Sequence, residues 1–242
     1  MSLARLAHGH TLLEDLAVVT WAVPLPALAS LLPAEVSPRS FTLSRHGDEG
    51  SGEVGLASLV AYRYRNFRFR GLPFARVAAR QVHVRAHVQL GGEDGVWFFS
   101  TSLDHPFVFL PKGLWAMPWH RDRIQEEAVW EGEVLQREEV AVEGTRALRL
   151  RLGGPAAGPL LAHDLVHEVV HPAVGWWQRT RGAGLGCLRV GHTTAEPSPV
   201  GVQEASCALL EGLGLVEPGA WPLNALAARS AAIEVHTPPR RV

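Results

Sequence analysis

The chain has 242 residues, of which 47% are hydrophobic and 19% are charged, and its formal net charge at pH 7 is −1. Because it has no basic stripe, it lacks the electrostatic footprint of a nucleic-acid-binding protein. Lys112 is the only lysine and all other basic side chains are arginines, which limits amine chemistry to one side chain and the N-terminus.

The cysteine content and the longest uncharged stretch bear on where the protein is located. Cys187 and Cys207 are too few for a disulfide framework, which predicts free thiols in a reducing compartment. Residues 16–32 carry no charge, but they include two prolines and are shorter than a usual membrane span. Glu14 and Asp15 precede them, where a signal peptide has positive charge. We therefore expect a cytoplasmic protein that does not bind membranes.

The N-terminal part predicts strands separated by turns. Residues 16–23 are rich in β-branched side chains, which is typical of a buried strand, and residues 24–32 suit a helical turn. Further strands are expected at 39–46 and 52–64. Residues 62–70 then alternate aromatic and cationic side chains. Since no other basic surface accompanies them, this pattern favours the rim of a pocket over a nucleic-acid-binding strip.

The clearest hairpin joins residues 80–90 to residues 96–103 through a glycine-rich turn. Side chains of a strand alternate between two faces, and here one face is apolar and the other polar. The polar face, called the polar row below, consists of Gln81, His83, Arg85 and His87. We expect the polar row to face a cavity, where the arginine would hold a carboxylate or another small anion. The alternative is a row that faces solvent.

The C-terminal part continues the alternation of short elements. The sequence predicts strands within 117–152, a helix at 160–170, strands at 185–191 and 200–210, a helix at 220–229, and a last strand at 231–236 before a tail. Many strands at short intervals with few helices predict a β-rich α+β fold, as a sandwich or barrel. No linker interrupts the chain, so we expect a single domain over residues 1–242.

Several strings of residues resemble the YqjF-like bacterial family, a domain of unknown function (2071). These strings include Arg70-Gly-Leu-Pro73, Val82-His-Val-Arg85, Gly95-Val-Trp-Phe-Phe-Ser100, Leu114-Trp-Ala-Met-Pro-Trp-His120 and Trp177-Gln-Arg-Thr-Arg-Gly182. The resemblance implies a fold similar to acetoacetate decarboxylase: a closed antiparallel, double-layered β-cone or barrel with a central cavity and a few peripheral helices. It is also consistent with a small acidic or carbonyl metabolite as the ligand.

The resemblance does not extend to the decarboxylase chemistry. Acetoacetate decarboxylase uses a lysine as an imine-forming nucleophile, kept unprotonated by an adjacent cation. Trp119 and His120 stand where that family has its two lysines, and neither can form a Schiff base. A carboxylate of the decarboxylase site would fall near Gln81, which cannot act as a base. Lys112 is a poor substitute, because a lysine that forms imines needs a pKa lowered by burial or a nearby cation. We therefore do not expect a Schiff-base decarboxylase.

The ligand-binding site expected from these observations combines the polar row with two tryptophans, Trp97 and Trp119. If the protein catalyses a reaction, His120 is the expected acid–base group. The sequence does not decide whether the chain is an enzyme or a binding protein. No cofactor is expected, the partner is a small molecule, and a homo-oligomer is compatible with the sequence.

A second hypothesis rests on His167-Glu168-Val-Val-His171, which matches the zinc-protease pattern. Two histidines four residues apart share one helix face and can bind Zn²⁺ while the glutamate activates water, and His163 lies on the same stripe. Pro172 follows at once and tends to end the helix near the second ligand. Although Pro172 counts against it, a zinc-dependent hydrolase using His167, Glu168 and His171 is the alternative function. A non-catalytic interaction module with a filled core is the third hypothesis.

Overall fold

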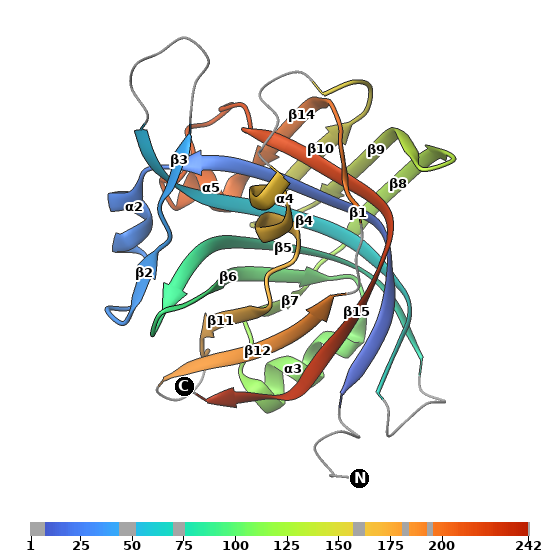
Figure 1. Ribbon diagram of the computed structural model, residues 1–242. Coiled ribbons are helices and arrows are strands. Elements are labelled where there is room, and N and C mark those ends of the chain that lie inside the picture. Colours follow the sequence, from blue (N-terminus) through green and yellow to red (C-terminus); the bar gives the residue numbers. More distant parts are fainter. Residues whose placement is uncertain are drawn as a thin grey trace.

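The structure is a computed structural model that describes residues 8–43, 52–69, 76–156, 163–180, 184–192 and 196–241. Long curved strands dominate it, and its few helices are short (Figure 1). The strands are β1 (Gly9–Val23), β2 (Val36–Pro38), β3 (Phe41–Leu43), β4 (Gly52–Phe69), β5 (Val77–Leu90), β6 (Glu93–Leu103), β7 (Trp119–Arg121), β8 (Ile124–Glu131), β9 (Val134–Val142), β10 (Leu148–Leu152), β11 (Val174–Gln178), β12 (Leu185–His192), β13 (Ser198–Pro199), β14 (Val202–Cys207) and β15 (Asn224–Arg241). The helices are α2 (Leu25–Ser30), α3 (Phe109–Trp115), α4 (His163–Val170) and α5 (Ala208–Gly212), with a 3₁₀ turn at Pro106–Val108.

Strands of the larger sheet close into a ring. Their order is β5-β4-β1-β15-β12-β11-β6, and β6 pairs back with β5. Figure 1 shows β1 in blue, β4 in teal and β15 in red running side by side along one wall of this ring. Within the described ranges, every pairing is antiparallel except those of β6 with β11 and with β7. The predicted β-rich fold is confirmed, with this parallel seam as an addition.

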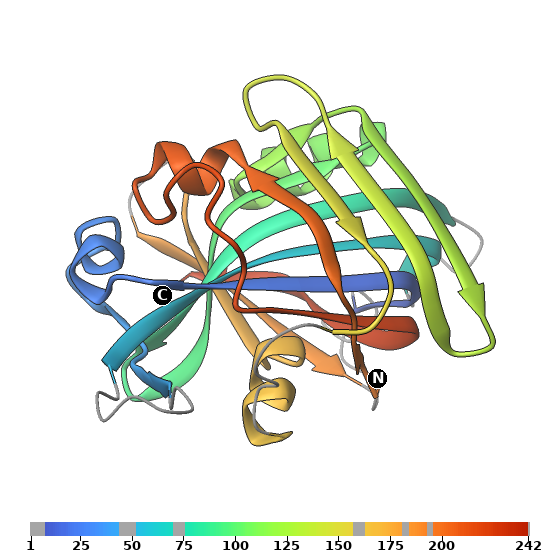
Figure 2. The same cartoon turned by 90° about the horizontal axis from the view of Figure 1, so that it is seen from above.

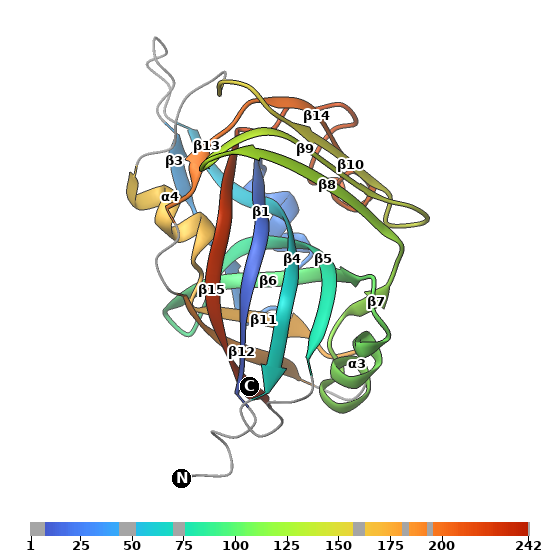
Figure 3. The same ribbon diagram turned by 90° about the vertical axis from the view of Figure 1, so that its right-hand side faces the viewer.

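A second layer covers part of the ring. The sheet β14-β10-β9-β8 lies across the outer face of β1, β4 and β5 (Figures 2 and 3). Apolar side chains fill the space between the layers, with Val19 and Leu59 from the ring packed in the same cluster as Val140 and Leu150 from the second sheet. Alternate residues of the ring strands point to this core, so those in between face the interior of the ring.

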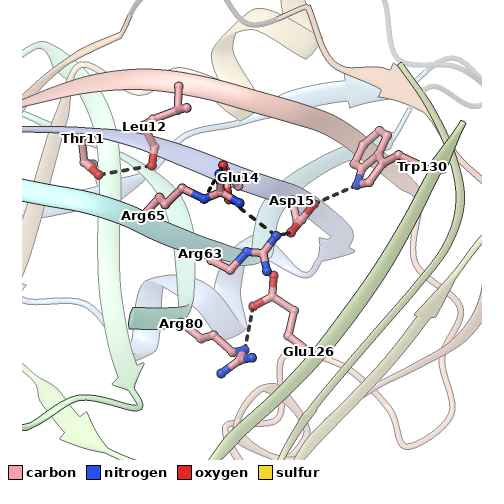
Figure 4. Close-up of polar contacts among 9 residues, drawn as sticks. All are labelled: Thr11, Leu12, Glu14, Asp15, Arg63, Arg65, Arg80, Glu126 and Trp130. Atoms are coloured by element: carbon pink, nitrogen blue, oxygen red, sulfur yellow. Dashed lines mark hydrogen bonds and ion pairs between the residues drawn. The ribbon is translucent and has the colours of Figure 1, made fainter. Parts of the chain in front are cut away.

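A bulge in β1 ties the two layers together. The register of β1 with β4 shifts between Glu14 and Ala17, and Asp15 has φ 53°, a left-handed conformation that aspartate tolerates better than most residues. The Trp130 Nε1 of β8 donates a hydrogen bond to the Asp15 carboxylate at 2.8 Å, and Arg63 of β4 pairs with that carboxylate at 2.5 Å (Figure 4). The irregular backbone therefore places a polar link between ring and second sheet.

The parallel seam between β6 and β11 needs one residue without a side chain. A Cβ atom added to Gly175 of β11 would overlap the ring of Phe98 on β6. Gly175 lies beside Val96 in the pairing of these two strands. The glycine thus allows the aromatic ring to lie flat against the neighbouring backbone.

The largest departure from the sequence prediction is β15. The predicted helix at 220–229 and the predicted tail after residue 236 are both wrong, because residues 224–241 form one strand that pairs with β1, β12 and β13. Alanine has a high helix propensity, but Ala225 and Ala227 are buried between the layers, where small side chains let the sheets approach. The strand predicted at 200–210 also ends early, at Cys207, where α5 follows.

Two smaller predictions concern the cysteines and membrane spans. Cys187 and Cys207 are both buried and form no disulfide with each other, in agreement with the prediction. In the part of the chain that the structure describes, no helix is long and apolar enough to cross a membrane.

Candidate functional site

The interior of the ring contains a cavity of about 130 Å³. By the same measure a single buried water needs about 10–15 Å³, so the space suits a small metabolite. Most of the wall is apolar or aromatic, with Phe67, Phe98, Phe107, Trp115 and Met117 among the lining residues. Such walls, with few polar groups, are typical of small-molecule sites.

The polar row supplies three polar residues of this wall. Gln81, His83 and Arg85 line the cavity, and their exposed fractions are 5%, 6% and 4%. The row therefore faces the interior of the ring, and the alternative of a solvent-facing row is excluded for these three residues. The three side chains face the same side because residues two apart on a strand such as β5 share one face.

An extra residue in β6 keeps the wall continuous beside the polar row. The register of β6 with β5 skips Phe99, which makes it the inserted residue of a bulge. Phe98 lines the cavity before the bulge and Thr101 lines it afterwards, although residues three apart on a regular strand face opposite sides. The bulge therefore brings a hydroxyl into the wall.

Two tyrosines of β4 extend the polar row by hydrogen bonds. Tyr64 donates its hydroxyl to Gln81 Oε1, and Gln81 Nε2 donates to the Tyr62 hydroxyl at 2.6 Å. Gln81 Nε2 also lies 3.3 Å from His83 Nδ1. Burial raises the pKa of Tyr62 to about 12 and the pKa of Tyr64 well above its usual value. Both phenols are therefore neutral at physiological pH.

His83 lies between aromatic rings. Tyr62 and Phe98 approach it edge-on, with ring centroids at 5.7 and 5.3 Å. Burial, and then the charge of Arg85, lower the pKa of His83 well below its usual value, so the imidazole is neutral. Among the described residues its Nε2 has no hydrogen-bond partner. This atom is therefore available to a ligand.

Arg85 is the charged group of the cavity. One of its terminal nitrogens donates to the carbonyl oxygen of Val169 at the end of α4, and its Nε has no partner among the described residues. Burial lowers the pKa of Arg85 to about 10, so the guanidinium stays protonated at neutral pH. The lining contributed by the described ranges contains no aspartate, glutamate or lysine. A buried cation without a counter-ion is unfavourable unless an anion joins it.

Comparison with known proteins gives the family. The model of the family DUF2071, described as "Uncharacterized conserved protein (COG2071)", matches residues 10–231. The chain belongs to this family. A search of curated proteins found no match.

Solved structures with the same fold as this DUF2071 protein include acetoacetate decarboxylases. The enzyme from Legionella pneumophila subsp. pneumophila str. Philadelphia 1 has a TM-score of 0.60 and 12% identity, over 97% of this chain and 86% of that one. An acetoacetate decarboxylase-like enzyme from Sphingomonas wittichii RW1 has a TM-score of 0.62 and 13% identity, over 97% and 92%. The enduracididine biosynthesis enzyme MppR, in complex with pyruvate, has a TM-score of 0.62 and 12% identity, over 97% and 90%. At these identities the likeness shows the fold, and it confirms the acetoacetate decarboxylase-like fold predicted for the chain.

The only lysine of this DUF2071 protein lies away from the cavity. Lys112 is exposed on α3 and is not a lining residue, although Pro111 and Trp115 of the same helix are. The cavity wall thus carries no lysine amine.

The two residues that stand in for the decarboxylase lysines point in different directions. Trp119 lines the cavity, whereas the adjacent His120 is not a lining residue. His120 is half-buried, and burial, followed by the charge of Arg146, lowers its pKa. Arg146 binds Asp122 at 2.7 Å on the same side of β7. Neighbouring residues of a strand face opposite sides, which explains why Trp119 lines the cavity and His120 does not, and the acid–base role of His120 stays a prediction.

Two further predicted residues lie outside the cavity lining. His87 continues the face of the polar row but packs edge-on against Phe41, with ring centroids 5.9 Å apart, beyond the cavity. Trp97 lies between two lining residues of β6 and points outward into a separate apolar cluster that includes Trp176. Periodicity identified the face of each residue for β5, but it does not tell where along a strand the cavity ends.

The zinc-protease pattern lies on and just after α4. The rings of His167 and His171 are 5.2 Å apart, but Glu168 forms an ion pair with Arg39 at 2.8 Å. Among the described residues no third ligand joins these two histidines in a metal-binding group, and the side chain of His163 lies outside the described part. His171 instead lines the cavity.

Tyr62 and Tyr64 are the site residues that the sequence reading missed. Their segment was expected at a pocket rim, but β4 pairs with both neighbours over most of its length and turns these rings into the cavity. The two-residue spacing of the tyrosines, continued from the strand before them, is the signal that places them on one face.

Proposed function

We propose that this DUF2071 protein, as one cytoplasmic domain over residues 1–242, binds a small carboxylate with a short apolar body in the cavity. Arg85 carries the proposal: the residue is 4% exposed and the described cavity lining offers its guanidinium no carboxylate. A carboxylate from solution would supply the missing charge and accept two parallel hydrogen bonds.

The neutral part of the polar row would select the rest of the ligand. His83 Nε2 has no partner among the described residues, and the tyrosine and glutamine side chains form a neutral chain of hydrogen bonds beside it. A carbonyl or hydroxyl oxygen next to the carboxylate would match this polar edge. The aromatic wall would hold a short apolar remainder. A 2-oxo acid combines these features, and the fold relative MppR has been solved in complex with pyruvate.

The proposed function is ligand binding without the formation of an imine. An imine-forming nucleophile must be an amine within reach of the bound carbonyl, and Lys112 is exposed on α3 outside the cavity lining.

Thermal unfolding with a series of small 2-oxo acids, beginning with pyruvate, tests the proposal. A ligand that binds only the folded state raises the midpoint temperature with its concentration, and at about 100 times Kd it adds about 2.7 kcal/mol. We expect this rise for the carboxylates and not for the matched neutral amides. Equal stabilisation by acid and amide, or none by any acid of the series, would rule out the proposed site.

Three variants locate the effect. Arg85→Met should abolish the stabilisation by the acid, while Arg189→Met, which removes an exposed arginine paired with Glu93 outside the cavity, should leave it unchanged. Arg85→Lys keeps the charge without the planar fork and should retain a weakened response. A full response in Arg85→Met would contradict the role of Arg85.

A further inference from the structure

A group of metal-binding side chains lies on the outer wall of the ring, apart from the cavity. His8, Glu234 and His236 each offer one ligand atom, and these three atoms lie within 4.8 Å of one another. His8 Nδ1 is 3.3 Å from Glu234 Oε1, and the rings of His8 and His236 stack with centroids 4.7 Å apart. In the described part of the chain this is the one such group of three.

The strand register explains why residues far apart in sequence meet here. β1 pairs antiparallel with β15, with Gly9 opposite Val235 and His10 opposite Glu234. Continued by one residue, this register sets His8 opposite His236, and Glu234 lies two residues before His236 on the same face. The intervening residues Ile233 and Val235 line the cavity, so the three ligands point outward.

The ligand types match a borderline divalent transition ion. Imidazole nitrogens with one carboxylate oxygen form three-ligand zinc sites, which keep a further position for water. Metal–ligand bonds of about 2.0–2.1 Å in a tetrahedron place neighbouring ligand atoms about 3.3 Å apart. The His8–Glu234 distance of 3.3 Å already has this value, and the ligand atom of the exposed His236 lies within 4.8 Å of the other two.

The surroundings leave one side of the group open. Gly191 of β12 lies opposite Glu234, and a Cβ atom added there would still be 3.7 Å from His236 Nε2. Arg189, the residue of β12 opposite His236, is held by Glu93 through contacts of 2.7 and 2.8 Å. The nearest strand therefore presents a residue without a side chain and an arginine already paired with another carboxylate.

We propose that His8, Glu234 and His236 bind a divalent transition-metal ion of the zinc class, with water completing the coordination. The ion joins the beginning of β1 to β15 from outside the cavity wall. The site is separate from the His167/His171 pair and does not depend on the ligand proposed for the cavity.

Metal binding to the full chain without a histidine tag tests the proposal. Titration with Zn²⁺ alone should show one ion bound per chain and a rise in midpoint temperature, whereas Mg²⁺ should have no effect because it prefers oxygen ligands. Co²⁺ should give the visible absorption of an ion with four or five ligands. No binding of Zn²⁺, or half an ion per chain, would overturn the site.

Variants separate this group from the other histidines. His236→Ala removes an exposed side chain, so the fold is expected to persist, and the affinity for Zn²⁺ should fall at least tenfold. His8→Ala should have the same effect, and Glu234→Gln a smaller one. The double variant His167→Ala/His171→Ala is the matched control and should bind like the parent chain. Unchanged affinity in His236→Ala, or loss of binding in the control, would place the ion elsewhere.

Discussion

The cavity lining that the structure describes contains the guanidinium of Arg85 and no carboxylate, whereas between the ring and the second sheet several carboxyl groups lie close together. The latter group, called the acid cluster, consists of Asp15, Glu126 and Glu138. Both regions are buried and polar, but the charge they lack has the opposite sign. The cavity is short of an anion, and the acid cluster is short of cations.

The acid cluster is only partly neutralised by arginines. Arg63 pairs with Asp15 at 2.5 Å, while Arg80 Nε is 3.8 Å from a carboxylate oxygen of Glu126 (Figure 4). Glu138 is fully buried, and neither of its oxygens has a hydrogen-bond partner among the described residues. Burial, then the charges of Glu126 and Asp15, raise the pKa of Glu138 well above its usual value.

The two regions therefore restore neutrality by different means. A carboxyl group can take up a proton, so Glu126 and Glu138 can become neutral without an arginine partner. An arginine with a pKa of about 10 does not lose its proton near neutral pH, so only an anion could balance the charge of Arg85. An unbalanced buried charge thus indicates a ligand site only where the charged group cannot gain or lose a proton near neutral pH. The same contrast predicts opposite pH dependences for the two regions.

The largest expected effect belongs to the acid cluster. Burial, followed by the charge of Asp15, raises the pKa of Glu126 from 4.5 to about 7. The folded protein therefore binds this proton more tightly than the unfolded chain, and the resulting stability is complete below the unfolded pKa and lost as the pH rises through the folded pKa. A pKa shift of this size corresponds to about 3 kcal/mol in the free energy of unfolding.

Denaturant unfolding of the parent chain and of Glu126→Gln measures this effect. The parent should lose about 3 kcal/mol relative to the variant between pH 4.5 and pH 8. Glu127→Gln, which changes the exposed neighbour on the same strand, is the control and should show no such trend. If the difference in unfolding free energy between the parent and Glu126→Gln stays constant with pH, the two regions do not differ in pH dependence as predicted.

A smaller effect of opposite sign is expected beside the cavity. Burial, then the charges of Arg85 and Arg39, lower the pKa of His87 from 6.5 to about 3. The unfolded chain then binds the proton more tightly, so this contribution is present above the unfolded pKa and is lost as the pH falls towards the folded pKa. Between pH 7.5 and pH 5 the loss is about 2 kcal/mol. Denaturant unfolding at the two pH values measures this loss of unfolding free energy. The loss should disappear in His87→Phe and persist in the control His167→Gln. An equal loss in both variants would refute the prediction.

The smallest expected effect concerns Lys112. Because its side chain is exposed outside the cavity, Lys112→Met should change stability by less than about 0.5 kcal/mol and leave the response to pyruvate intact. Reduction with borohydride in the presence of pyruvate should leave no adduct on this lysine by mass spectrometry. An adduct at Lys112 would contradict this prediction and show that this lysine forms an imine with pyruvate.

The sequence predicted those features that depend on local alternation. The spacing of Gln81, His83 and Arg85 places three side chains on one face whatever the rest of the fold, and the apolar residues between them identify the opposite face as core. The strings shared with the YqjF-like family predicted the architecture, and the family match and the fold relatives confirm it.

The features that sequence missed depend on contacts between distant strands. The alanines of β15 suit a helix in isolation, and only burial between two layers makes them part of a strand. The bulge at Phe99 reverses which residues face inward, and no local pattern marks it. His8 and His236 meet because β1 and β15 are neighbours in the ring, which spacing along the chain does not reveal. Position along a strand, rather than its face, separated His87 from the rest of the polar row.

Gly175, a lining residue of the cavity, limits how closely Phe98 can approach the backbone of β11. Phe98 rests on this glycine and, on its other side, touches the ring of His83 edge-on. A methyl group at position 175 would push the phenyl ring towards the imidazole and narrow the chamber, while every polar contact partner stayed in the sequence. Within the family, the volume of this cavity can therefore change through a substitution at Gly175, a backbone position of its wall.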